Sequence, residues 1–237
     1  MFNLSLKSLF LLCFLCPIAL CYGQDDPLPS WNDGKTKQAI IRFINETTST
    51  DSSNFIAPQD RIAVFDQDGT LWVEQPIYTQ FVFAIDRLRS LAEKHPEWKN
   101  TEPYKSIIEG NVEKIQNFTV QDIEKVIAVS HSNMTVEQFN DDVKAWLANA
   151  VHPRFKKPYT ELIYQPMLEV IRFFNDHGYI VYIVSGGGQE FIRTFSEKVY
   201  GIPVENIIGS AGKVKYEYRD GKPALIKQPT VLFIDDK

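Results

Sequence analysis

Cysteine is scarce in this chain. Only three cysteines are present among 237 residues, and all of them, Cys13, Cys16 and Cys21, lie in its first segment. The rest of the chain has no thiol, which excludes a disulfide framework, a cysteine nucleophile and a cysteine-ligated zinc site there. Any chemistry carried by that part must use oxygen and nitrogen groups.

Positive charge is also in short supply. The chain has 25 Lys and Arg against 30 Asp and Glu, a formal net charge of -5 at pH 7. Nucleic-acid binding needs a clustered basic surface that neutralises phosphates. We therefore predict no nucleic-acid partner, and we expect any bound phosphate to be held by local groups.

No apolar run is long enough for a comfortable membrane span. The longest, S-L-F-L-L-C-F-L-C-P-I-A-L, follows Lys7 and is too short for a helix that crosses a bilayer. This pattern is typical of a secretory signal peptide over residues 1–23, cleaved after Gly23 or after Cys21. We predict an exported protein, periplasmic or secreted, with no stable membrane span after signal removal. A lipoprotein anchored through Cys21 is the alternative.

The most informative stretch is residues 61–72, R-I-A-V-F-D-Q-D-G-T-L-W. Its apolar run predicts a short buried strand, which ends at two carboxylates, Asp66 and Asp68, and a glycine. Successive strand residues point to opposite faces, so the two acids can share one side while Gln67 points away. Two such acids can divide the work of a nucleophile and of a general acid and base.

Paired acids have two plainer interpretations, a solvated turn and a calcium-binding loop. A calcium loop of the helix-loop-helix kind needs further oxygen ligands at alternate positions and a late Glu. Leu71, Trp72 and Val73 stand there instead, and they disfavour calcium.

A second pattern follows at residues 179–188, Y-I-V-Y-I-V-S-G-G-G. Its continuous apolar character predicts a strand that is buried on both faces of a parallel sheet. The glycines do not match a dinucleotide fingerprint or a nucleotide P-loop. The N–H groups of Gly186 and Gly187, with a helix starting near Gln189, are suited to phosphate oxygens, although an ordinary strand-to-helix turn has the same composition.

Strands that alternate with helices predict an α/β class, a doubly wound parallel sheet core. The mostly helical stretch over 76–159 is too long for a simple crossover and predicts an inserted helical cap, with the core formed by 24–75 and 160–237. Alternatively, these helices belong to the core itself. Further expected elements are helices over 35–46, 104–109, 120–129, 136–150, 162–175 and 191–199, and a hairpin that turns at Asp220-Gly221.

Some cap residues are candidates for substrate contact. His131 and His152 have a suitable chemistry, although a solvated loop around Pro153 and Pro158 is the competing interpretation. Glu74, just after the acidic loop, is better placed to face the site.

The sequence D-Q-D-G-T, together with S-G-G-G, resembles the first two motifs of the haloacid dehalogenase superfamily, in particular its phosphoserine-phosphatase-like members with a helical cap. The resemblance implies that Asp66 is the nucleophile and Asp68 the general acid and base. It also implies a Mg2+ ion held by Asp66 and by the backbone carbonyl of Asp68, and a Ser185 hydroxyl that holds the transferring phosphoryl group.

Two further motifs of that family match less well. The lysine that steadies the phosphate is matched best by Lys237, with Lys213 and Lys215 as alternatives. The last motif supplies metal-binding acids, but no glycine precedes Asp235 in the closing V-L-F-I-D-D-K. We therefore expect either a C-terminally incomplete chain or a shortened protein that binds metal poorly.

The resemblance implies a magnesium-dependent phosphomonoester hydrolase that acts on a small phosphorylated substrate through an aspartyl-phosphate intermediate. A phosphotransferase would use the same residues with another acceptor. A dehalogenase would share Asp66 without requiring Asp68. The non-enzymatic alternative is an inactive protein that binds phosphate.

Overall fold

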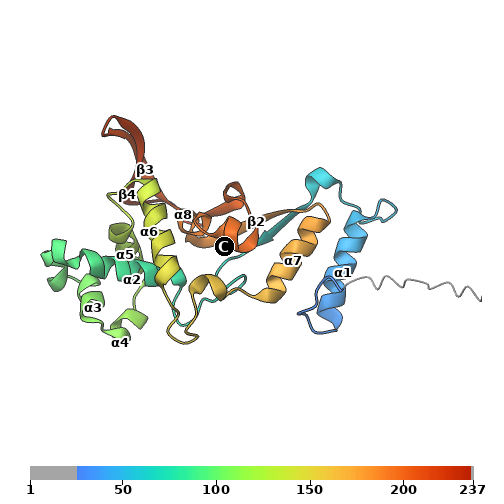
Figure 1. Cartoon of the computed structure of the whole chain (residues 1–237), viewed down its shortest axis with the longest axis horizontal. Helices are drawn as coiled ribbons and strands as arrows, with labels where there is room; N and C mark the ends of the chain where they lie inside the picture. Colours follow the sequence, from blue (N-terminus) through green and yellow to red (C-terminus); the bar gives the residue numbers. More distant parts are fainter. Residues whose placement is uncertain (1–25, 236–237) are drawn as a thin grey trace, which may run out of the picture.

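The computed structural model describes residues 26–235 (Figure 1). Its sheet has four strands in the order β1-β2-β3-β4, of which the first three are parallel and the last is antiparallel. These strands are β1 (Ile62–Phe65), β2 (Ile180–Gly188), β3 (Ile207–Arg219) and β4 (Lys222–Phe233). The predicted α/β class with a mostly parallel sheet is confirmed. The predicted signal peptide, the anchor at Cys21 and the candidate Lys237 lie outside the described residues.

The helices begin and end close to where the sequence predicts them. Five predicted segments appear as single helices, and the segment expected over 191–199 forms two short ones. No helix among residues 26–235 is long and apolar enough to cross a membrane. The helices are α1 (Lys35–Thr48), α2 (Thr79–Leu91), α3 (Tyr104–Glu109), α4 (Val112–Gln116), α5 (Val120–Ser130), α6 (Val136–Asn149), α7 (Gln165–Asp176), α8 (Gln189–Arg193) and α9 (Ser196–Tyr200).

The two faces of the sheet differ in burial. One face carries Ala63, Val181, Ile183 and Ile207, which are at most 8% exposed. The register places Ile62, Val64, Ile180 and Ile208 on the opposite face, where they are 44% to 57% exposed. The prediction that the strands are buried on both faces is therefore wrong for the described residues. Right-handed crossovers that add strands in one direction place their helices on one face only.

The helices between β1 and β2 have a small apolar core of their own. It consists of Phe81, Ala84, Ile85, Leu88, Trp98, Ile107, Ile115 and Val126. Helix α6, which begins with a capping box between Thr135 and Gln138 as predicted, packs instead into the main core through Phe139, Val143 and Leu147. The assignment of residues 76–159 to a separate cap therefore stays a prediction.

The β3-β4 hairpin joins the sheet to these helices (Figure 1). It turns at Asp220 and Gly221, both with positive φ, as predicted. Lys227 on β4 exchanges backbone hydrogen bonds with the loop before α6: its N–H donates to the Met134 carbonyl and its carbonyl accepts from Asn133 N–H, both at 2.9 Å. The loop between α5 and α6 is therefore held against the hairpin.

Candidate active site

The acidic loop after β1 is tightly folded. The carbonyl of Gln67 accepts hydrogen bonds from the N–H groups of Leu71 at 2.9 Å and Thr70 at 3.3 Å. Gly69 has a φ of 71°, and a side-chain carbon there would lie 2.7 Å from the carboxyl carbon of Glu74. The backbone conformation therefore favours glycine at this position, and a larger residue would also displace the Glu74 carboxylate. Glu74 faces the loop, as expected.

The side chain of Gln67 points into the core, away from the solvent side of the loop. It is 1% exposed, and its Nε2 donates to the Tyr200 hydroxyl at 2.8 Å. Asp66 and Asp68, on either side of it, are only half-buried. This is the alternation that an extended backbone predicts.

Tyr200→Phe is expected to destabilise the fold by about 1–3 kcal/mol, the cost of a buried polar group without a partner. Within residues 26–235, Gln67 Oε1 already lacks a hydrogen-bond partner, and the change would leave the whole buried amide without one. Urea denaturation followed by circular dichroism measures the loss. The matched control, Tyr164→Phe at an exposed position, should change stability by less than about 0.5 kcal/mol. Equal stability of the two variants would contradict the role given to Tyr200.

The two acids of the loop are held in different ways. Asp68 Oδ1 accepts a hydrogen bond from Trp72 Nε1 at 2.7 Å, and the indole is buried and stacked on Phe195 with ring centroids 4.6 Å apart. Asp66 Oδ1 accepts from the N–H of Gln67 at 2.7 Å. Asp68 is thus oriented by the core, whereas Asp66 is oriented by its own loop.

The glycine loop after β2 departs from the regular ladder. Ser185 pairs with Gly209 and Gly188 pairs with Ser210, and the register shifts between them. Ser185 is 1% exposed, and its Oγ accepts from the N–H of Gly187 at 3.2 Å. Helix α8 has only five residues, so the helix-dipole contribution expected near Gln189 is small. We name residues 185–188 the phosphate loop, after the role that the sequence predicts for them.

The tips of β1 and β2 meet at Gly187. A side-chain carbon built on Gly187 would lie 3.4 Å from Ser185 Oγ and 3.6 Å from both Asp68 Oδ2 and Gln80 Oε1. The acid, the hydroxyl and the glycine backbone therefore surround one small space. Gln80, on α2, is a residue that sequence reasoning missed, because nothing local distinguishes it on a helix.

Among the described residues, neither Lys213 nor Lys215 contacts the phosphate loop. Lys213 and Lys215 are exposed on the hairpin, and Lys237 lies outside the described residues. The structure instead buries Lys227, with Nζ 3.7 Å from Glu190 Oε2 and 4.4 Å from the centroid of the Phe139 ring. Burial lowers the pKa of Lys227 from its ordinary value.

Both candidate histidines are buried, so the solvated-loop interpretation is wrong for them. His152 is 1% exposed and its Nε2 bonds the carbonyl of Gln75 at 3.0 Å. His131 is 8% exposed and contacts Gln80 at 3.3 Å between Nε2 atoms. His152 therefore holds the segment that leads from the acidic loop into α2, and His131 contacts the residue, Gln80, that lies beside the phosphate loop.

The end of the described chain returns to the phosphate loop. The Ser210 hydroxyl donates to the Gly186 carbonyl at 2.8 Å and accepts from the N–H of Asp235 at 3.1 Å. Asp235 Oδ2 is buried and has no hydrogen-bond partner among residues 26–235. Sequence reasoning did not place this acid near the site, because the contact joins residues far apart in the chain.

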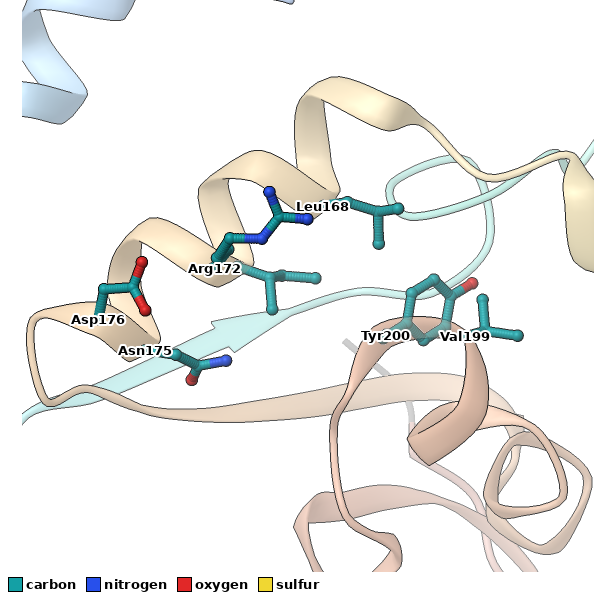
Figure 2. A pocket seen from close by; sticks show the side chains of 7 residues that line it. Leu168, Arg172, Asn175, Asp176, Val199 and Tyr200 are labelled. Carbon is teal, nitrogen blue, oxygen red and sulfur yellow. The ribbon is translucent and has the colours of Figure 1, made fainter. Parts of the chain in front are cut away.

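A cavity of about 350 Å³ lies between α7 and α9, and Figure 2 shows residues that line it. Its walls are Leu168, Ile171, Arg172, Asn175, Asp176, Val199 and Tyr200. It contains neither the acids nor the phosphate loop, and it borders the site only through Tyr200. It is therefore not the catalytic pocket.

The donor set at the tip of β1 fits a magnesium ion. Mg2+ is commonly held by one or two carboxylates, with waters and substrate phosphate as the other ligands. Asp66 offers a half-buried carboxylate, and Asp68 offers its backbone carbonyl, at the loop that follows β1. Residues 26–235 contain no cluster of three or more His, Cys, Asp or Glu that would form a complete protein cage. An ion there would thus depend on substrate and water for most of its ligands.

The sequence also matches a known family. The family profile of haloacid dehalogenase-like hydrolases matches residues 63–231, which include both loops and most of the hairpin. The chain belongs to this family. The resemblance to this family that the sequence indicated is confirmed. A separate search of curated proteins found no match.

Several solved structures are similar to this member of the haloacid dehalogenase-like hydrolases. A protein of unknown function from Bordetella pertussis Tohama I is 14% identical, with a TM-score of 0.46, over 72% of this chain and 66% of that one. A phosphoserine phosphohydrolase-like protein from Francisella tularensis is 21% identical, with a TM-score of 0.35, over 68% and 61%. A phospho-aspartyl intermediate analogue of phosphoserine phosphatase is 20% identical, with a TM-score of 0.31, over 72% and 62%. The chain spans less than two thirds of the length of each of these structures.

Proposed function

We propose that this haloacid dehalogenase-like hydrolase is a magnesium-dependent phosphatase that hydrolyses small, soluble phosphate monoesters. The observation that carries the proposal is the meeting of Asp68, Ser185 and the glycine backbone around one space, with Asp66 two residues before Asp68. A phosphoryl group needs positioning and charge neutralisation more than covalent chemistry, and such a space supplies donors on several sides.

The first half of the reaction transfers the phosphoryl group to the protein. A carboxylate oxygen of Asp66 attacks phosphorus, and the bond between phosphorus and the ester oxygen breaks. Asp68, in its protonated form, gives its proton to the departing oxygen, which leaves as an alcohol. The hydrogen bond from Trp72 holds one oxygen of Asp68, so the other faces Gly187 and the reacting group.

The second half returns the protein to its starting state. Asp68, now a carboxylate, takes a proton from water, and the water oxygen attacks the phosphorus bound to Asp66. The bond between Asp66 and phosphorus breaks, and inorganic phosphate leaves. The Ser185 hydroxyl and the N–H groups of Gly186 and Gly187 hold the phosphoryl oxygens through both halves.

Mg2+ held by the Asp66 carboxylate and by the backbone carbonyl of Asp68 would neutralise the negative charge that otherwise keeps a phosphate away from Asp66. We further propose that the protein is exported to the periplasm or secreted, a proposal supported by residues 1–23 alone.

Hydrolysis of p-nitrophenyl phosphate with and without the chelator EDTA tests the function. We expect turnover with millimolar Mg2+ and a fall on the order of 10²-fold or more in EDTA, because the ion contributes several kcal/mol of charge stabilisation. Restoring Mg2+ should restore the rate, and Ca2+ at the same concentration is the matched control. Equal rates with and without chelator would overturn the metal dependence. Phosphate binding without turnover would indicate the inactive phosphate-binding protein instead.

A further inference from the structure

A side chain of the helical region reaches the backbone of the phosphate loop. Gln80, in the first turn of α2, accepts a hydrogen bond from the N–H of Gly188 at its Oε1, at 2.7 Å. A side-chain carbon on Gly188 would lie 2.6 Å from Gln80 Nε2, so the contact exists only because residue 188 is glycine. The side chain of Gln80 therefore reaches the backbone of the loop directly, because residue 188 has no side chain of its own.

Gln80 is in turn oriented by a buried histidine. Its Nε2 lies 3.3 Å from His131 Nε2, and His131 Nδ1 lies 2.8 Å from Ser130 Oγ. Ser130 Oγ donates to the Val126 carbonyl at 2.7 Å. A hydroxyl has a single proton, so Ser130 must accept from the N–H at His131 Nδ1.

The protonation state of His131 determines the direction of the hydrogen bond between His131 and Gln80. Burial, with the charges of Lys227 and Arg87, lowers the pKa of His131 to about 3. The imidazole is therefore neutral at pH 7 and carries its one proton at Nδ1. Its Nε2 is then an acceptor for the Gln80 amide N–H, and the amide oxygen must face Gly188.

We propose that Gln80 is a positioning residue of the phosphate loop, which it holds through Gly188 while His131 and Ser130 hold Gln80. The proposal rests on the function proposed above. Gly186 and Gly187 lie where the pairing of β2 with β3 shifts register, and they have no side chains to anchor them. Gln80 holds the last residue of this irregular stretch, Gly188. The conformation of the phosphate loop therefore depends on the positions of α2, which carries Gln80, and of α5, which ends next to His131.

The experiment compares four variants of the whole chain with the unaltered protein: two single changes, their combination and a control. Gln80→Met keeps the length of the side chain and removes the amide, and His131→Phe keeps a ring beside Phe83 and Phe139 but removes the acceptor. The control, Gln138→Ala, removes a glutamine from the capping box of α6 and does not touch the loop. Each is assayed for kcat and KM with p-nitrophenyl phosphate, and for hydrogen exchange of the amides of residues 186–188.

We expect Gln80→Met to lower kcat by about 10- to 100-fold with little change in KM, because a displacement near 1 Å costs that much in rate. His131→Phe should lower kcat less, and the double variant should be no worse than Gln80→Met, since both changes break one chain of hydrogen bonds. The Gly188 amide should exchange faster in both variants and at the normal rate in Gln138→Ala.

Three results would overturn the proposal: additive losses in the double variant, an equal loss of kcat in Gln138→Ala, or unchanged exchange at Gly188 in Gln80→Met. If the unaltered protein hydrolyses no phosphate ester, the proposed function fails, and the exchange rates still decide whether Gln80 holds the loop. Should Gln80→Met fail to fold, His131→Phe alone decides it.

Discussion

Asp66→Asn is expected to lower the rate of phosphate ester hydrolysis by on the order of 10⁴-fold or more, the scale of losses when a nucleophile is removed. Asparagine has nearly the same shape, and its amide oxygen still accepts the hydrogen bond that Gln67 N–H gives to Asp66. Because Asp66 is only half-buried, we expect the variant to fold normally. Initial rates with p-nitrophenyl phosphate, with circular dichroism as the folding check, measure the effect.

The matched control for this change is Asp60→Asn, which alters an exposed acid before β1. It should retain full activity, so that a loss at residue 66 cannot be assigned to a change in net charge. Retention of more than a tenth of the activity in Asp66→Asn would show that another group attacks phosphorus.

Gly209→Ala should have the second largest effect, on the order of 10²-fold in kcat. Gly209 lies on β3 directly beside Ser185, and a methyl group there would lie 2.6 Å from the carbonyl oxygen of Gly187. Backbone cannot give way as a flexible side chain can, so the phosphate loop must shift. A shift of about 1 Å in a positioned group is enough for a loss of this size. Steady-state kinetics with p-nitrophenyl phosphate measure it.

The same strand offers a control in Gly212→Ala. A methyl group at Gly212 would meet its nearest neighbours at 4.0 Å, an ordinary contact distance. We expect near-normal kcat in this variant. Similar losses in both variants would mean that β3 tolerates no side chain for reasons unrelated to the phosphate loop, and the steric argument would then be wrong.

The sequence predicted the parts of the site that local patterns encode. An apolar run that stops at acids or at glycines marks the end of a buried strand, and parallel strands bring their carboxyl ends to one edge. Asp68 and Ser185 could therefore be placed together in advance. The capping box at Thr135 and the hairpin at Asp220 are local in the same sense, and both were predicted correctly.

The residues that were missed depend on contacts between distant segments. Gln80 is one polar residue on a helix, and only the packing of α2 against the phosphate loop gives it a role. Lys227 lies next to the buried Ile226 on β4, and its burial comes from contacts with α6 and α8. No periodicity in the sequence distinguishes such residues from solvated ones.

The error about the sheet has a different cause. A continuous apolar run predicts two covered faces, but covering depends on where the neighbouring helices lie. In the described residues, Ile62, Val64, Ile180 and Ile208 are exposed, although the sequence makes them as apolar as their buried neighbours. Apolar composition identifies a strand reliably but does not say what packs on it.

The bond between Trp72 and Asp68 gives the site an optical reporter. Indole emission responds to the charge and hydrogen bonding around its ring, and this ring donates directly to Asp68, the proposed general acid and base. The chain has only three other tryptophans, Trp31, Trp98 and Trp146, and none of them is bonded to a group of the acidic loop in the described residues. With those three replaced by phenylalanine, the fluorescence of a single side chain would follow events at Asp68 in real time, without a label.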